Sequence, residues 1–326
     1  MSKIAFVTGI IGQDGPYLAQ FLLGKGYQVF GLVRRYSKPN FENLEYLGIQ
    51  NSIEYVEGDV TDESSLINII KTIRPDEVYN LAAQSFVGAS WDQAKLTTEI
   101  NALGVLYLLN SLKHFAPTAR FYQASTSEMF GLSSTNGTQD EETSFHPRSP
   151  YGISKVYAHW MTVNFRESYN MYTASGILFN HESPLRGTQF VTRKISQSVA
   201  KIKLGLEKEI RLGNLDAKRD WGFAGDYVEA MYLMLQQEKP TDFVVGTGEN
   251  HSVQEFVELA FKHIGINDWQ NYVKKDPRFM RPAEVYNLKA NPKRAREILG
   301  WNPKTSFGDL VKMMVDADIK RLEDKK

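Results

Sequence analysis

Short apolar runs alternate with longer amphipathic stretches through the first half of the chain. Runs with the length and composition of strands lie at residues 3–8, 28–33, 53–57, 77–81 and 121–125. Helical spacing of apolar positions lies between or after them, at residues 17–23, 64–73, 96–115 and 151–169. Strands that alternate with helices lie side by side in a parallel sheet, because a parallel connection needs a crossover. The pattern therefore predicts an α/β fold with a doubly wound parallel sheet.

The pattern changes after a sixth strand-like run at residues 173–179. Residues 180–187 contain proline, serine and glycine, which predicts a loop. Helical patterns follow at 190–204, 223–237, 253–264, 293–299 and 307–322, with short strand-like pieces such as 243–245 between them. We therefore expect residues 1–179 to form mainly a nucleotide-binding domain and residues 180–326 mainly a smaller C-terminal α/β substrate-binding domain. We also expect segments of chain to cross between the two.

Composition removes several classes of function. The 326 residues contain 38 Lys and Arg against 38 Asp and Glu, so no overall positive field attracts nucleic acid or an anionic membrane. There is no cysteine, which excludes disulfides, thiolate metal sites and iron–sulfur clusters, and we predict no metal site. Gln13 and Asp14 interrupt the apolar start of the chain, so we expect no signal peptide and a cytoplasmic protein.

A glycine-rich turn follows the first strand directly. Its residues are Gly9, Ile10, Ile11, Gly12, Gln13, Asp14 and Gly15, and it opens a helix with Pro16 in the first turn. Spaced glycines let the backbone turn tightly and approach a pyrophosphate, and free N–H groups at the helix start attract its negative charge. The turn therefore predicts a Rossmann-type dinucleotide site, with an ordinary tight strand-to-helix turn as the alternative.

The end of the second predicted strand bears on the choice of cofactor. A site for NAD usually has an acidic residue there, which binds the ribose 2′-hydroxyl. This chain has Arg34 and Arg35 instead, and guanidinium groups can bind a 2′-phosphate bidentately. The sequence thus favours NADP over NAD, the alternative being two solvated surface arginines.

Candidate catalytic side chains lie around the fifth predicted strand. Tyr151 and Lys155 are four residues apart and share one helix face, where an ammonium group can lower the pKa of a phenol. Thr126 and Glu128 follow the strand, at the edge of the sheet where ligands of open parallel sheets bind. These residues predict a base and a carboxylate at the cofactor, although such a spacing also occurs by chance and such a loop also serves only as a cap.

With these motifs the chain resembles the GDP-mannose 4,6-dehydratase family, a nucleotide-sugar branch of the extended short-chain dehydrogenases/reductases. The likeness covers nearly the whole chain and rests on residues 9–15, 59–60, 81–85, 125–128, 151–155, 178–184, 219–222 and 281–284. The run 178–184 is the most specific of these. Ile11 and Pro16 depart from the family, which usually has threonine and a small residue there.

The resemblance implies a binding role for further residues. Beside the glycine turn and the arginines, the cofactor would contact Asp59, Val60, Leu81, Ala82, Ala83, Gln84, Ser85, Tyr151, Lys155, His181 and Arg186. The nucleotide sugar would contact Ser85, Ser127, Glu128, Asn180, Lys194, Arg219, Arg281 and Glu284. Arginine and lysine suit a diphosphate, and glutamate suits hydroxyl groups or a base edge.

The resemblance also implies a reaction, the dehydration of GDP-mannose to GDP-4-dehydro-6-deoxy-D-mannose with NADP as a recycled cofactor. Tyr151, assisted by Lys155 and Thr126, would remove the O4 proton, and Glu128 would act as acid and base at C5 and C6. The product would feed the synthesis of deoxyhexoses of the rhamnose and fucose type. Family members commonly form homodimers or homotetramers, so self-association is expected. A 4-keto sugar reductase, a dehydratase or epimerase of another nucleotide sugar, and a non-catalytic NADP sensor are the alternatives.

Overall fold

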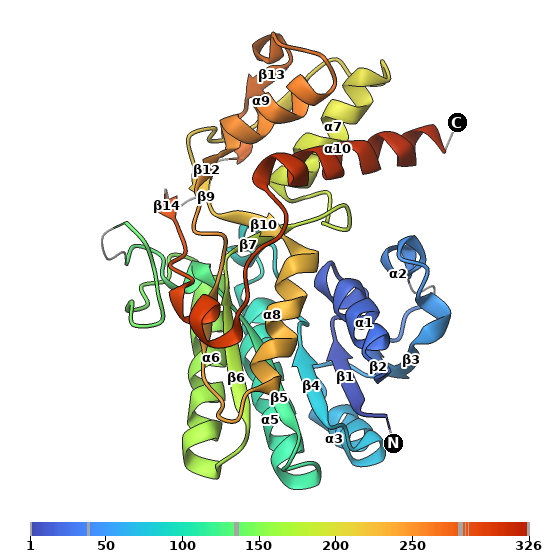
Figure 1. The fold of residues 1–326 in the computed structure, drawn as a ribbon, viewed down its shortest axis with the longest axis vertical. Coiled ribbons are helices and arrows are strands. Elements are labelled where there is room, and N and C mark those ends of the chain that lie inside the picture. Colours follow the sequence, from blue (N-terminus) through green and yellow to red (C-terminus); the bar gives the residue numbers. More distant parts are fainter. Residues whose placement is uncertain are drawn as a thin grey trace.

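The computed structural model describes residues 2–37, 40–133, 137–279, 283, 285 and 287–324. In this part of the chain, seven parallel strands form one sheet in the order β11-β6-β5-β4-β1-β2-β3 (Figure 1). They are β1 (Ile4–Thr8), β2 (Gln28–Val33), β3 (Glu54–Glu57), β4 (Glu77–Asn80), β5 (Arg120–Thr126), β6 (Thr173–Leu178) and β11 (Phe243–Val245). The strand order reverses between β1 and β4, and this switch point is where doubly wound folds bind ligands.

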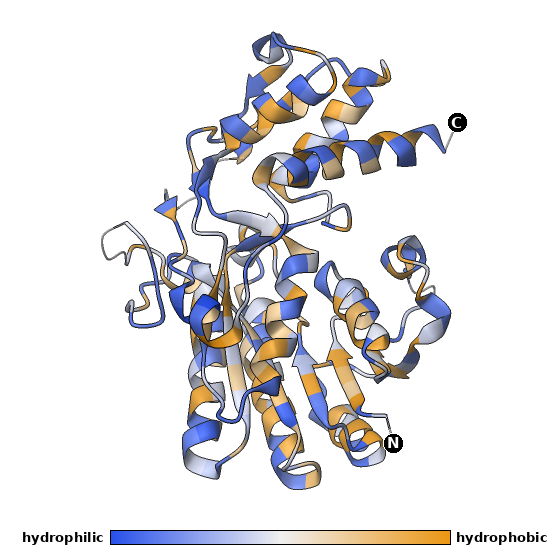
Figure 2. Cartoon of the chain, viewed as in Figure 1, coloured by the Kyte–Doolittle hydropathy of each residue, from blue (hydrophilic) through white to orange (hydrophobic). Residues whose placement is uncertain are grey.

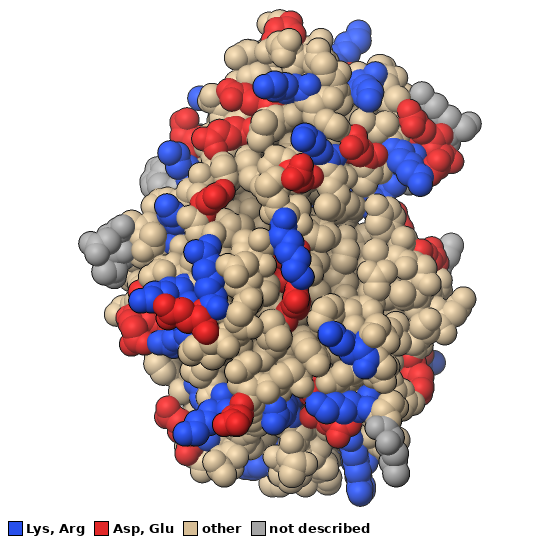
Figure 3. All heavy atoms as spheres, in the orientation of Figure 1, with Lys and Arg blue, Asp and Glu red and all other residues tan. Residues whose placement is uncertain are grey.

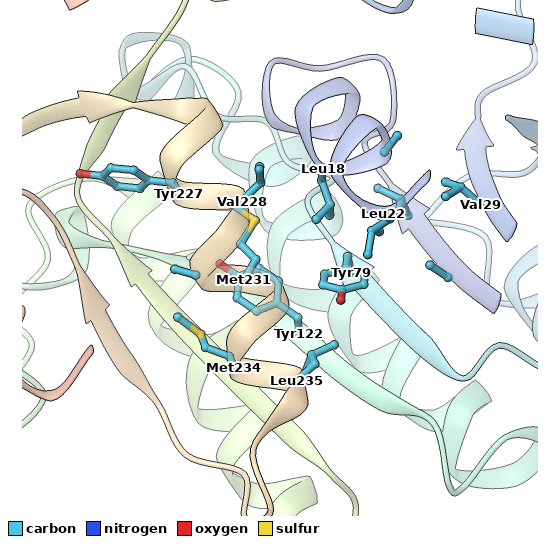
Figure 4. Close-up of a cluster of buried hydrophobic side chains, with 14 of the residues drawn as sticks. Leu18, Leu22, Val29, Tyr79, Tyr122, Tyr227, Val228, Met231, Met234 and Leu235 are labelled. Atoms are coloured by element: carbon cyan, nitrogen blue, oxygen red, sulfur yellow. The ribbon is translucent and has the colours of Figure 1, made fainter. Parts of the chain in front are cut away.

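Helices cover both faces of this sheet. They are α1 (Asp14–Gly24), α3 (Glu63–Ile73), α5 (Gly104–Phe115), α6 (Pro150–Tyr169) and α8 (Ala224–Gln236). On one face α1 and α8 pack together through Leu18, Leu22, Met231 and Leu235, all fully buried (Figure 4). On the other face α3, α5 and α6 share a second core. Apolar residues thus concentrate along the strands and the helix faces toward them (Figure 2).

A second lobe lies above the carboxyl ends of the strands in Figure 1. Its three main helices are α7 (Val191–Lys203), α9 (Val253–His263) and α10 (Phe307–Glu323), which pack around their own apolar core. Short strands pair beside them: β8 (Ile210–Leu212) with β13 (Val273–Lys275), β9 (Lys218–Arg219) with β12 (His251–Ser252) and β14 (Asn287–Leu288), and β10 (Trp221–Phe223) with β7 (Asn180–Glu182).

The remaining elements are short. They are the helices α2 (Glu42–Tyr46) and α4 (Ala94–Thr98), π-helical turns at Glu99–Leu103 and Ala295–Leu299, and 3₁₀ turns at Gln50–Ser52, Val87–Ser90, Ser127–Met129, Trp269–Asn271 and Pro277–Phe279. The π-helical turn at Glu99–Leu103 joins α4 to α5, so the helix predicted at 96–115 is continuous from Ala94 but changes its winding on the way. Within the described ranges, no helix is both long enough and apolar enough to cross a membrane.

The predicted α/β fold with a doubly wound sheet is confirmed, and the six strands expected in the first half are all present. The loop predicted at 180–187 is wrong in its first residues, because Asn180–Glu182 forms β7 and pairs in parallel with β10. Because β10 lies about 40 residues later in the chain, no local sequence pattern could predict that β7 pairs with it. The short run at 243–245 becomes β11, the edge strand beside β6, so the second half of the chain completes the first sheet.

Candidate active site

A cleft of about 1540 Å³ runs between the carboxyl edge of the sheet and the second lobe. Sites for one small molecule usually measure ~300–1,000 Å³, so this cleft has room for two ligands side by side. Residues from the turn after β1, the ends of β4, β5 and β6, the start of α6 and the second lobe all line it. Acidic and basic side chains are interspersed over the face seen in Figure 3, so that face carries no large patch of one sign.

The glycine turn has the geometry of a phosphate cradle. Gly9 has a φ of +72°, and a Cβ there would lie 2.8 Å from the Ala82 nitrogen. A Cβ on Gly15 would lie 2.5 Å from the Gly9 carbonyl oxygen, to which the Gly12 N–H donates over 3.0 Å. Because α1 begins at Asp14, its free N–H groups point out of this turn. The turn is therefore tight enough to need its glycines and open toward an anion.

Fifteen of the predicted cofactor residues besides Arg34, Tyr151 and Lys155 line the cleft or its rim. They are Gly9, Ile11, Gly12, Gln13, Asp14, Gly15, Asp59, Val60, Leu81, Ala82, Ala83, Gln84, Ser85, His181 and Arg186. Among the described lining residues, Ile10 and Arg35 do not occur. Ile10 is fully buried and packs against Gly31 in the core, and Arg35 is exposed beyond the end of β2.

Arg34 is the arginine of the pair that reaches the cleft. Its guanidinium lies 4.9 Å from the ring centre of Tyr36. Nearby, the Asp59 carboxylate accepts hydrogen bonds from the backbone nitrogen and the hydroxyl of Thr61, at 2.9 and 2.8 Å. A basic residue at the end of β2 thus borders the cleft, and the acidic group of Asp59 is held by its own loop.

The candidate catalytic residues converge from two adjacent elements. Thr126 ends β5, Glu128 follows it, and Tyr151 and Lys155 lie on the first turns of α6, all at the cleft. The Ser149 hydroxyl caps α6 by accepting from the Gly152 N–H at 3.0 Å, which fixes where the helix starts. Lys155 Nζ lies 5.9 Å from the ring centre of Tyr151, and Tyr151 hydrogen bonds with Thr126.

Burial governs the protonation of this group. It raises the pKa of Tyr151 to about 12, with the hydrogen bond from Thr126 acting in the opposite direction and Glu128 adding to the rise. Burial also lowers the pKa of Lys155 to about 8. The expected lowering of the phenol pKa does not result in this structure, because burial outweighs any attraction from the Lys155 ammonium, whose Nζ donates to the Ala124 carbonyl oxygen at 2.9 Å.

His181 joins the glycine turn to β7. Its Nε2 lies 2.8 Å from Asp14 Oδ2 and its Nδ1 lies 2.8 Å from the Phe179 carbonyl oxygen. Close by, Arg186 Nε lies 3.1 Å from Glu182 Oε2, and its guanidinium lies 3.6 Å from the ring centre of Phe190. His181 and Arg186 therefore connect the cofactor end of the cleft to the second lobe.

The predicted substrate residues that the structure describes also line the cleft. They are Ser85, Ser127, Glu128, Asn180, Lys194 and Arg219, whereas Arg281 and Glu284 lie outside the described residues. Lys194 Nζ lies 3.3 Å from the ring centre of Phe279, and burial lowers its pKa. Arg219 is buried and donates from Nη1 to the Lys218 carbonyl oxygen at 2.8 Å. The two cations come from α7 and β9, which are separate in the sequence.

Sequence reasoning missed several residues of the cleft. Arg278 and Phe279 line it from the turn after β13, beside Lys194. Arg278 forms a two-pronged ion pair with Asp276, at 3.0 and 2.7 Å. Glu182, which is buried at the end of β7, also lines the cleft and was not predicted. Arg278 stands three residues before the Arg281 motif, and that proximity was the signal available in the sequence.

A doubly wound sheet, a glycine turn at its switch point, and a Tyr151 and Lys155 pair beside that turn define a nucleotide-binding protein of the short-chain dehydrogenase/reductase class. The model of one family within that class, "GDP-mannose 4,6 dehydratase", matches residues 6–314. This chain belongs to that family.

Similar proteins agree with this assignment. GDP-mannose 4,6 dehydratase 2 of Arabidopsis thaliana is 53% identical over 329 residues, which cover 97% of this chain and 87% of that protein. GDP-mannose 4,6 dehydratase of Homo sapiens is 49% identical and covers 97% and 91%. Among solved structures, UDP-glucose 4-epimerase of Thermus thermophilus in complex with NAD is 25% identical, covers 97% of this chain and 98% of its own, and has a TM-score of 0.84.

Proposed function

We propose that this protein is an NADP-dependent hydro-lyase that converts GDP-mannose to GDP-4-dehydro-6-deoxy-D-mannose and water. One observation carries the proposal: Thr126, Glu128, Tyr151 and Lys155 meet at one cleft that also contains a phosphate cradle and two cations of the second lobe. The dehydratase activity named for relatives that are 49% and 53% identical over most of their length supports the choice of substrate.

The cofactor end of the cleft suits a nicotinamide dinucleotide. The turn from Gly9 to Gly15 would hold the diphosphate, and Lys155 would hold the nicotinamide ribose. Arg34 supports NADP, because it is a basic residue that lines the cleft at the end of β2, where an acidic residue would favour NAD. Bound there, the cofactor supplies a hydride acceptor that can return the hydride within the same turnover.

Tyr151 is the base for the sugar O4 hydroxyl in this proposal. Its raised pKa means that the phenolate needs stabilisation, which the Thr126 hydrogen bond and the Lys155 ammonium provide. Below its pKa of about 8, Lys155 carries the positive charge that this role requires. Oxidation at C4 gives a ketone, which makes the C5 hydrogen acidic.

Glu128 then performs the elimination. Its carboxylate removes the C5 proton, and the same carboxyl group protonates the C6 hydroxyl as the C6–O bond breaks. One proton and one hydroxyl leave the sugar as water. A hydride returned to C6 and a proton delivered to C5, which replaces the one taken from O4, would complete the product, so the whole reaction balances without an added acid. Lys194, Arg219 and Arg278 line the side of the cleft where the GDP diphosphate would be bound.

The test is to incubate the purified protein with GDP-mannose, without added cofactor, and to follow sugar mass and nicotinamide absorbance. We expect a product lighter by one water and no net change in NADPH. Turnover that starts only after NADP⁺ is added would retain the reaction and remove the claim of a retained cofactor. A protein that binds NADP and leaves GDP-mannose unchanged would overturn the substrate.

Two variants separate the residue roles. Tyr151→Phe should lose turnover by ~10²–10⁴-fold and still bind NADP, because only the base is removed. Glu128→Gln should reduce its cofactor with GDP-mannose and release no water, because oxidation at C4 precedes the step that needs the carboxylate. A Tyr151→Phe variant with unchanged turnover would contradict this assignment.

We also propose that the chain self-associates through α6. Ile153, Tyr157 and Trp160 lie on one face of this helix and are exposed, Ile153 by 59% and Trp160 by 56%. Large apolar side chains gathered on one surface usually mark an interface. A dimer in sedimentation velocity that dissociates in Trp160→Glu is the expected result, and a monomeric native protein would contradict it.

A further inference from the structure

Both ring nitrogens of His181 face hydrogen-bond acceptors. Nδ1 lies 2.8 Å from the Phe179 carbonyl oxygen, and Nε2 lies 2.8 Å from Asp14 Oδ2. A carbonyl oxygen and a carboxylate oxygen can only accept, so each contact needs an N–H from the ring. A neutral imidazole has one N–H, whereas imidazolium has two. The geometry therefore matches a protonated His181 opposite an ionised Asp14.

The surroundings of Asp14 favour its ionised form. Gln13 Nε2 donates to its other oxygen, Oδ1, at 3.0 Å. Asp14 is also the first residue of α1, where the free N–H groups of the helix stabilise a negative charge. Burial would raise the pKa of this carboxyl, but His181 and these hydrogen bonds hold it below its ordinary value.

Taken together, the groups that face the His181 ring favour its protonated form. Burial would lower its pKa and Arg186 adds to that effect, but Asp14 and the Phe179 carbonyl raise the pKa above its ordinary value. The ring of Tyr227 from α8 stacks on the imidazole at a centroid distance of 4.8 Å. The side chains of His181 and Asp14 are 12% and 19% exposed, so solvent screens their attraction little.

An ionised carboxylate is unexpected at the turn that would hold a diphosphate. Asp14 lines the cleft between Gly12 and Gly15, and on its own it would repel an anion there. We propose that protonated His181 is a positioning residue of the cofactor site, which cancels the charge of Asp14 and fastens the glycine turn to β7. This inference rests on the dinucleotide-binding part of the proposed function, and not on the dehydration.

Neighbouring contacts give the same connection between turn and strand. Gln13 Nε2 donates to the His181 carbonyl oxygen at 3.0 Å, and the Ser183 hydroxyl donates to Gln13 Oε1 at 3.1 Å. Since β7 pairs with β10 of the second lobe, a shift of His181 would also move the wall that carries Asn180. The His181 side chain therefore balances the charge of Asp14, and the contacts of Gln13 with His181 and Ser183 fix the position of the glycine turn against β7.

The test is a double-variant cycle on the affinity for NADP⁺, measured by titration calorimetry from about pH 6 to pH 9. His181→Gln leaves Asp14 uncompensated and should weaken binding by about tenfold or more. Adding Asp14→Asn to that variant should restore most of the affinity, because the repelling charge is gone. If the double variant binds as weakly as His181→Gln, charge cancellation is overturned.

Asp14→Asn alone gives a second, independent outcome. The pKa of His181 should return toward about 6.5, so the affinity for NADP⁺ should rise as the pH falls through that value. In the native protein this dependence should appear only at a higher pH, because Asp14 raises the pKa of the His181 imidazole. A pH-independent Asp14→Asn variant would contradict the proposal.

Ring-nitrogen chemical shifts of His181 test the native protein without any variant or ligand. The imidazolium signature should persist above about pH 7.5, and titration near pH 6.5 would overturn the proposal.

His263→Gln is the matched control for the binding measurements, because His263 also pairs with an aspartate, Asp316, at 2.6 Å but is not among the described residues of the cleft. Its affinity for NADP⁺ should equal that of the native protein. A native protein that binds NADP⁺ but does not dehydrate GDP-mannose would affect the proposed function alone.

Discussion

Lys155 on α6 donates a hydrogen bond from Nζ to the carbonyl oxygen of Ala124 on β5, over 2.9 Å. Gln123 Nε2 donates to the same oxygen at 2.9 Å, and its own Oε1 accepts from Asn80 at 2.8 Å. Asn80 in turn accepts from the Thr8 hydroxyl at 2.6 Å. A buried polar chain thus links the residue before the glycine turn to the candidate catalytic lysine, across three neighbouring strands. The position of Lys155 is therefore set by the sheet as well as by its helix.

Replacing Lys155 with methionine should stabilise the protein while it removes activity. Burial lowers the pKa of Lys155 to about 8, so between about pH 8 and 10.5 the unfolded chain binds more protons than the folded one. Below pH 8 the folded state bears the full cost of the buried charge, which a shift of this size puts at ~3 kcal/mol.

Lys155→Met should therefore raise the free energy of unfolding by ~1–3 kcal/mol near pH 7, less the lost hydrogen bond to Ala124. This gain should shrink as the pH rises through about 8 toward 10, because native Lys155 then loses its proton. Turnover should fall by ~10²-fold or more. Urea unfolding at the two pH values measures the gain, and a gain that does not change with pH would contradict the argument.

Arg34 and Arg35 offer a matched test of cofactor choice. Both side chains are exposed, but Arg34 lines the cleft and Arg35 is not among the described lining residues. Arg34→Ala should reduce the preference for NADP⁺ over NAD⁺ by ~10–100-fold, since a charge-assisted bond to a phosphate contributes ~1.5–3 kcal/mol. Arg35→Ala should leave the ratio of the two dissociation constants unchanged. If the two substitutions changed this ratio equally, a specific role for Arg34 in binding the 2′-phosphate would be contradicted.

Two glycines of α1 should respond to alanine in opposite directions. A Cβ on Gly15 would lie 2.5 Å from the Gly9 carbonyl oxygen, so Gly15→Ala should distort the turn and abolish tight cofactor binding. A Cβ on Gly24 meets nothing within 4 Å, so Gly24→Ala should stabilise the helix by ~0.5–1 kcal/mol. Thermal unfolding and NADP⁺ titration check both, and a Gly15→Ala variant with native affinity would refute the cradle.

The ion pair of Arg193 and Asp318 should support one wall of the cleft, although neither residue is among the described lining residues. Asp318 is 2% exposed and binds Arg193 at 2.7 Å, and Arg193 Nη1 donates to the carbonyl oxygens of Pro184 and Arg186. Asp318→Asn leaves a buried cation without its counter-charge and should cost ~3–5 kcal/mol of unfolding free energy.

That substitution should also weaken cofactor binding, because it releases the loop that carries Arg186. Lys312→Ala on the same helix is the control. It removes an exposed pair with Asp309 at 3.6 Å and should change stability by less than ~1 kcal/mol. Equal losses in the two variants, measured by chemical unfolding, would argue against a special role for the buried pair.

Local sequence features predicted much of the fold and of the candidate site. The glycine turn, the start of α6 and the spacing of Tyr151 and Lys155 depend on residues a few positions apart, and backbone sterics and helix geometry act at that range. The alternation of strands and helices likewise predicted the doubly wound sheet. Each element has its own spacing of apolar residues in the sequence, and parallel strands need crossover connections.

Tertiary contacts decided the rest. The pairing of β7 with β10, the addition of β11 to the first sheet, and the separation of Arg34 from Arg35 at the cleft depend on chain segments that are distant in sequence. The same holds for protonation. The sequence by itself determined which titratable groups the site has, but burial and the direction of each side chain decided their charge, since these fix the cost of desolvation and the nearest partner.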